Sequence, residues 1–257
     1  ALLGAAMVGA LAPAFGVFLV LRRLSLIADT LSHVALAGVA IGLLTKTFPP
    51  YVALVATSLV AVAIEQLRSR RLLPGDAALA VFLYAALAVA VVIISVADGF
   101  NADLFGYLFG SVLSTTAYDL WLLFGLLIAV FAFVTVFYSE LAQSSFDPDL
   151  ARISGVRVGL VNSGLAVLTA ATITLAMRIV GVLLVGAMIV VPVLISLRLV
   201  TGLRATIVTA SAVGLLVALG GVTVAFYTDV AAGGAVVLTG IVVLLSAEIW
   251  TFLRKKV

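Results

Sequence analysis

The sequence contains no cysteine, which excludes a disulfide framework, a thiolate metal site and a redox-active thiol pair. Charge is also scarce, because only 10% of the 257 residues are charged, against about 25% in ordinary globular domains. So few charged side chains cannot cover a water-exposed surface, while 65% of the residues are hydrophobic. The composition therefore excludes a soluble domain and indicates that lipid surrounds most of the protein.

The motifs of common catalytic chemistry are missing as well. No Gly-Lys dipeptide occurs, so the chain has no P-loop with which to use ATP. It has no Gly-x-Ser-x-Gly elbow, no His-Glu-x-x-His helix and a single histidine, His33. We therefore predict that the chain is not an enzyme, that it holds no permanent cofactor, and that ATP is hydrolysed in a separate subunit. The net charge of +3 is not clustered on one face, so we expect no nucleic-acid partner.

Long apolar segments dominate what is present. A bilayer crossing needs about 20 mostly apolar residues, and the chain supplies such segments repeatedly. We predict an all-α, polytopic membrane helix bundle with eight to nine transmembrane helices, forming one domain over residues 1–257. The first segment lacks the charge order of a signal peptide, so we expect it to be retained as a span. The expected spans are 2–21, 26–44, 51–67, 77–97, 118–138, 159–177, 179–197, 205–226 and 232–253.

Basic residues predict the orientation of these spans, because Lys and Arg are retained on the cytoplasmic side of short loops. If the loop 139–158 is cytoplasmic, twelve basic residues lie inside, and Lys46 and Arg178 lie outside, which accounts for all 14. The C-terminus is then cytoplasmic. The residues placed inside are Arg22, Arg23, Arg68, Arg70, Arg71, Arg152, Arg157, Arg198, Arg204, Arg254, Lys255 and Lys256.

The same topology places several aspartates on the outer face, where an acidic mouth would favour a cation: Asp98, Asp103, Asp119 and Asp229. Segment 98–117 is too polar to span, and we expect an outer re-entrant or interfacial helix there. The glycine pairs Gly38/Gly42 and Gly106/Gly110 have the spacing of helix-packing motifs. Bundle packing is the expected role of both pairs, and pore lining is the alternative.

Asp29 and His33 form the most informative pair in the sequence. They are four residues apart and therefore lie on one face of a helix. Counted from Arg23 at the cytoplasmic interface, His33 lies about 15 Å into a hydrocarbon core roughly 30 Å thick. Ionisable groups at this depth mark ion pathways by default, and a carboxylate with an imidazole is a partial ligand set for a divalent transition metal. A hydrogen bond that only fixes helix packing is the alternative that spacing and depth leave open.

The loop 139–158 is the longest polar segment on the inner face. Within it, we predict a short helix that begins at Pro148, is capped by Asp147 and ends at Gly155. The spacing from Ala151 to Gly155 also fits the coupling loop through which permeases of ABC importers bind their ATPase. From the local sequence alone, an ordinary capped connector is the alternative.

The segment from Leu19 to Gly38, which contains Arg22-Arg23-Leu-Ser and Asp29-Thr-Leu-Ser-His33, resembles the opening of the membrane permeases of ABC-type zinc and manganese importers. The resemblance continues through 104–110, through the loop from Phe146 to Gly155 and through 181–192, and so covers nearly the whole chain. One departure is Ala37, where members of that family often have proline.

This resemblance implies a permease subunit that moves manganese or zinc into the cytoplasm of a prokaryote across its plasma membrane. It implies a homodimer with a second permease copy, two ATP-binding cassette subunits and an extracytoplasmic metal-binding protein. Asp29 and His33 would contact the metal. Phe146, Asp147, Asp149, Ala151 and Gly155 would form the ATPase-coupling loop. A secondary transporter or channel for divalent cations, without an ATPase, is the rival that composition alone permits.

Overall fold

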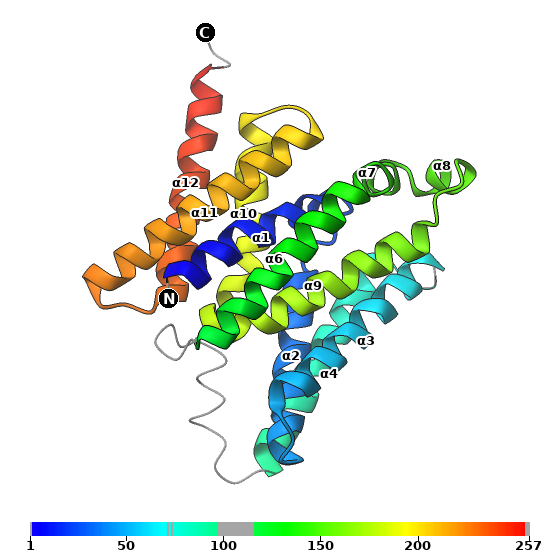
Figure 1. Ribbon diagram of the computed structural model, residues 1–257, viewed down its shortest axis with the longest axis vertical. Coiled ribbons are helices and arrows are strands. Elements are labelled where there is room, and N and C mark those ends of the chain that lie inside the picture. The colour runs from blue at the N-terminus through cyan, green and yellow to red at the C-terminus, as the bar shows by residue number, and fades with distance from the viewer. Residues whose placement is uncertain (1, 71, 73, 97–115, 255–257) are drawn as a thin grey trace.

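The computed structural model describes residues 2–70, 72, 74–96 and 116–254, and within these ranges it contains helices and no strand (Figure 1). Among the described residues, eight helices are long and apolar enough to cross a membrane, and the segment Leu184–Leu199 is apolar but shorter. The predicted all-α bundle with eight to nine spans is therefore confirmed. The helices are α1 (Leu2–Leu21), α2 (Ile27–Leu44), α3 (Pro49–Ser69), α4 (Gly75–Val96), α6 (Ala117–Val136), α7 (Tyr138–Phe146), α8 (Pro148–Ile153), α9 (Val158–Val180), α10 (Val182–Leu199), α11 (Leu203–Thr228) and α12 (Ala232–Arg254).

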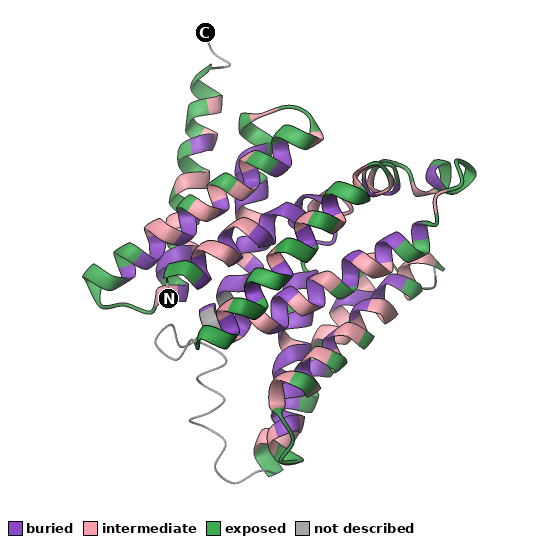
Figure 2. Cartoon of the chain, viewed as in Figure 1, coloured by how far each residue is buried: buried purple, intermediate pink, exposed green. Residues whose placement is uncertain are grey.

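The core of the bundle is built around α1, which packs against α11, α10, α6 and α9. Most of α1 is buried, whereas few residues of α12 and α4 are buried (Figure 2). Helices α1 and α11 approach closely because Gly9 faces Gly214, where an added methyl group would contact a backbone carbonyl. An apolar outer surface of this extent requires lipid or a protein partner.

The predicted glycine pair in α2 packs two helices together, as expected. A Cβ added to Gly38 would lie 2.6 Å from the Cα of Ala53, and one added to Gly42 would lie 2.6 Å from the Cα of Pro49. Both neighbours belong to α3, which therefore approaches α2 backbone to backbone. The second pair, Gly106/Gly110, and the helix expected at 98–117 lie outside the described residues, except for Thr116 and Ala117 at the start of α6.

The predicted span 118–138 is shorter in the structure. Helix α6 ends at Val136, the backbone bends at Phe137 (φ −99°, ψ 23°), and a separate nine-residue helix, α7, follows. The polar sequence of α7 explains the break, because Ser139, Glu140 and Gln143 could not face lipid. The sequence predicts one short helix in the loop 139–158. The structure has two helices there, α7 and α8.

The two ends of the helix bundle carry different polar contacts. One end carries α7 and α8, and we call it the α8 end. Hydrogen bonds bring Arg22 at the end of α1, Glu65 near the end of α3 and Asn162 near the start of α9 together there. At the opposite end, Asp119 in the first turn of α6 forms an ion pair with Arg178 in the last turn of α9, 2.9 Å apart.

Candidate metal path and coupling segment

Both predicted metal-contacting residues lie on α2. Asp29 is in the first turn, where the helix dipole favours a negative charge, and His33 follows one turn later. Asp29 is exposed and His33 is half-buried, while Thr30, Leu31 and Ser32 between them are fully buried. The helix therefore turns its carboxylate and imidazole toward the open side of this single chain and its hydroxyls into the bundle.

A glycine on α10 makes room for the carboxylate. A Cβ added to Gly186 would lie 2.9 Å from Oδ1 of Asp29, closer than two such atoms normally approach. Gly186 is buried, and α2 and α10 are in contact. The Asp29 carboxylate therefore occupies space that a side chain at position 186 would otherwise take.

The imidazole of His33 has an unused ring nitrogen. Its Nδ1 is buried and has no hydrogen-bond partner among the described residues. Buried polar atoms in native structures are almost always satisfied by protein, water or ion, so an unpaired imidazole nitrogen is available to a ligand. No further ligand joins Asp29 and His33 among the described residues, which contain no group of three or more His, Cys, Asp or Glu side chains that could hold a metal ion.

The short helix predicted in the loop 139–158 is present as α8, from Pro148 to Ile153, and so ends two residues before Gly155. Asp147 caps it as predicted, because its Oδ1 accepts hydrogen bonds from the backbone N–H groups of Asp149 and Leu150, each at 3.0 Å. Gly155 follows the helix with φ +85°, a conformation that side chains rarely tolerate. The space around Gly155 is open, so this position is restricted by backbone conformation and not by crowding.

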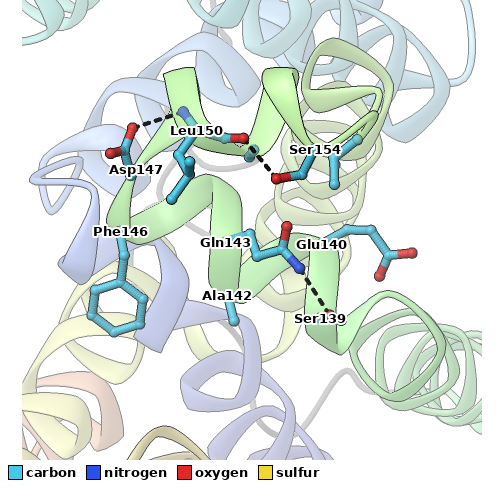
Figure 3. Close-up of a pocket in the computed structure, with 10 residues that line it drawn as sticks. Ser139, Glu140, Ala142, Gln143, Phe146, Asp147, Leu150 and Ser154 are labelled. Atoms are coloured by element: carbon cyan, nitrogen blue, oxygen red, sulfur yellow. Dashed lines mark hydrogen bonds between the residues drawn. The ribbon is translucent and has the colours of Figure 1, made fainter.

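The residues of the predicted coupling loop do not share one environment. Phe146, Asp147 and Ala151 line a pocket of about 560 Å³ between α7 and α8, with Glu140 on the side opposite Phe146 (Figure 3). Ala151 is buried and anchors α8 to its own chain. Asp149 lines a separate cavity, which also contains residues of α3.

An apolar surface is exposed on this segment. Phe146, Leu150 and Ile153 expose 69%, 59% and 84% of their surface. Three large apolar side chains at the polar α8 end of the bundle are typical of a protein-binding site. Asp149 and Arg152 form an exposed ion pair, 3.1 Å apart, beside them.

Two features of the site could not be recognised as such in the sequence. Gly186 lies in the segment 181–192 that carries part of the family resemblance, but its contact with Asp29 depends on two helices 157 positions apart in the chain. In the sequence, Arg22 marks the end of a span and belongs to the segment of family resemblance, but nothing there indicates its hydrogen bonds to α7 and α9.

Comparison with known proteins gives consistent results. The family model described as the ABC 3 transport family matches residues 1–251. The manganese import system permease protein ScaB of Streptococcus gordonii is 31% identical over 245 residues, covering 95% of this chain and 88% of that protein. The high-affinity zinc uptake system membrane protein ZnuB of Haemophilus influenzae is 30% identical over 223 residues, covering 87% of this chain and 85% of that protein.

A solved structure agrees with the sequence comparison. The structure of PsaBC from Streptococcus pneumoniae in complex with Fab superimposes with a TM-score of 0.83 and 30% sequence identity. The match covers 96% of this chain and 88% of the other.

Proposed function

The chain belongs to the ABC 3 transport family, and on that basis we propose that it is the permease of an ATP-driven importer of divalent transition-metal ions, manganese or zinc. It is a multi-pass membrane protein of the ABC transporter permease type. ATP would be hydrolysed by a separate subunit, because the sequence contains no P-loop.

The geometry of Asp29 and His33 on α2 is the observation that supports a metal path through this chain. Within a membrane span, Asp29 and His33 lie one turn apart on α2, with the Nδ1 of His33 unpaired and the carboxylate of Asp29 fitted against Gly186. A carboxylate offsets part of the lost hydration of a cation, and a neutral imidazole supplies a nitrogen ligand of borderline softness. Two ligands from one chain suit a conduit, because the ion must bind well enough to enter and weakly enough to leave.

The composition of this site leaves the metal open between manganese and zinc. One imidazole with a carboxylate leans toward manganese, whereas the general affinity order at nitrogen and oxygen sites favours zinc. The named relatives include one protein of each kind. We therefore assign the class of cargo, a divalent transition-metal ion, as the substrate.

The proposed assembly would complete two features of the single chain, the metal ligand set and the exposed apolar surface at α8. A second copy of the permease would supply the remaining ligands beside Asp29 and His33, because no third ligand joins them in the described residues. The exposed apolar face formed by Phe146, Leu150 and Ile153 would bind the ATPase. An extracytoplasmic metal-binding protein would deliver the ion, and α7, α8 and the C-terminus would face the cytoplasm of a prokaryotic cell.

The proposed path is tested by manganese and zinc uptake into vesicles that contain the permease and its ATPase. Asp29→Asn and His33→Gln change charge or ligand with little change in shape, and each is expected to lower uptake affinity on the order of tenfold or more. Asp76→Asn, at an exposed carboxylate in the first turn of α4, is the matched control and should transport normally. Full uptake by both site variants would leave Asp29 and His33 as an ordinary helix-packing pair.

A further inference from the structure

A polar network at the α8 end connects four parts of the chain that are far apart in sequence. We call it the Arg22 network, and it consists of Arg22, Glu65, Arg68, Ser144, Ser145 and Asn162. It joins the α1–α2 connection to α3, α7 and α9. Nothing in a metal path or in an ATPase-docking surface requires it, so its role needs a separate explanation.

Arg22 is the centre of this network. Its Nε donates to Ser145 Oγ at 2.9 Å, one terminal nitrogen donates to Asn162 Oδ1 at 2.6 Å, and the other donates to Ser144 Oγ at 2.9 Å. The planar guanidinium therefore holds three acceptors on α7 and α9 at once, in a geometry that a lysine could not reproduce. Hydrogen bonds from a charged donor are about twice as strong as neutral ones.

The network continues from Asn162 to α3. Asn162 Nδ2 donates to Glu65 Oε1 at 2.8 Å, and Arg68 contacts both carboxylate oxygens of Glu65 at 3.1 Å. Glu65 and Asn162 are buried. Burial lowers the pKa of Arg22 to about 10, while the Glu65 carboxylate opposes this effect, so Arg22 remains charged at neutral pH.

The backbone of Arg22 is connected to α2 by a tight, hydrogen-bonded turn. The backbone N–H of Leu24 donates to Leu19 O at 2.9 Å and that of Arg23 donates to Val20 O at 3.0 Å, with Arg23 at φ +60°. This is the Schellman arrangement that closes a helix, and the buried Leu24 packs in the core below it. Only five residues, 22–26, separate α1 from α2, and Asp29 lies in the first turn of α2.

Helix α8 faces the same network across a small cavity. A cavity of about 200 Å³ is lined by Pro148, Asp149 and Arg152 of α8 together with Glu65, Arg68 and Asn162. A displacement of α7 and α8 would therefore either break charged hydrogen bonds or carry Arg22 with it. The second outcome is favoured, because a partly buried charge that loses its partners is costly.

We propose that Arg22 is a positioning residue that transmits movement of α7 and α8 to α2, and so links ATP hydrolysis to the position of Asp29 and His33. This inference rests on the proposed function, because it presumes an ATPase bound at α8 and a metal on α2. Arg22 touches neither of them. It acts through the hydroxyls of Ser144 and Ser145 on one side and through the α1–α2 turn on the other.

The test measures metal ions transported per ATP hydrolysed by the reconstituted complex. Arg22→Gln should bind the ATPase and hydrolyse ATP, yet transport at least about tenfold fewer ions per ATP, since the loss of even one of the three charged hydrogen bonds is worth about a factor of ten in an equilibrium. Arg23→Gln removes the same charge from the exposed neighbouring residue and should keep the wild-type ratio. Metal binding to the detergent-solubilised Arg22→Gln complex should be unchanged.

A second variant approaches the network from α7. Ser144→Ala with Ser145→Ala removes two acceptors and should also uncouple transport, and adding Arg22→Gln to it should cause little further loss. This variant decides the matter if Arg22→Gln fails to assemble. A wild-type ratio in either assembled variant would overturn the role of Arg22. A wild-type complex that moves no metal with ATP would instead overturn the proposed function.

Discussion

Replacing Gly186 by alanine should disturb the metal path without unfolding the protein. The new Cβ would lie 2.9 Å from Oδ1 of Asp29, whereas carbon–oxygen contacts settle at about 3.3 to 3.6 Å. The contact is about half an ångström too short, and the end of the Asp29 side chain must move, because the added Cβ would lie 3.8 Å from the Cβ of Ala28 and meet no atom outside Asp29 more closely. Holding a side chain off its rotamer costs about 0.5 to 1.5 kcal/mol.

That cost predicts an affinity for transported metal about two- to tenfold lower in Gly186→Ala. Stability should not fall, because alanine is favoured over glycine inside a helix by about 1 kcal/mol. Gly125→Ala in α6 is the matched control, since no atom lies within 4 Å of the added Cβ. The assay is the half-saturating concentration for manganese and zinc uptake, with thermal unfolding of each variant measured in parallel. Unchanged uptake in Gly186→Ala would refute the claim that Asp29 contacts the ion from this position.

Three further predictions concern the coupling helix, helix packing and topology. Gly155→Ala should weaken ATPase binding roughly 5- to 30-fold in a pull-down titration, because φ +85° costs a side chain about 1 to 2 kcal/mol, whereas Gly159→Ala should not. Gly38→Val should destabilise the permease by more than about 1 kcal/mol in thermal unfolding, because its side chain meets the α3 backbone. A cysteine at Thr228 should react with an impermeant reagent in intact cells, while one at Ser154 should react only after permeabilisation; the reverse result would invert the orientation.

Local features of the fold could be predicted from the sequence because their physical causes lie within a few residues. The length and apolarity of each span predict a bundle of transmembrane helices, and Asp147 with Pro148 marks the start of α8. Gly38 shows its packing role through spacing alone. Asp29 and His33 share a helix face because they are one turn apart, and their contact with metal stays a prediction.

Features that depend on contacts between distant segments could not be predicted in this way. Arg22 is 122 positions from Ser144 and 140 from Asn162, and its position at the end of a span already had an explanation in topology. The sequence does not show where α6 ends and α7 begins. The apolar residues of α6 continue into Tyr138, and no charged residue marks the end of α6 at Val136. The sequence predicts that a short helix ends near Gly155, but it does not show that the backbone angle, and not crowding, restricts this position.

Metal uptake into vesicles decides whether this chain is an ATP-driven metal permease. Vesicles containing the permease and its ATPase are loaded with ATP, with no nucleotide, or with no nucleotide but an imposed proton or sodium gradient, and manganese and zinc accumulation is measured. Accumulation is expected only with ATP, and it should require a higher metal concentration in Asp29→Asn. Accumulation driven by an ion gradient without nucleotide would contradict this expectation and would establish a secondary transporter.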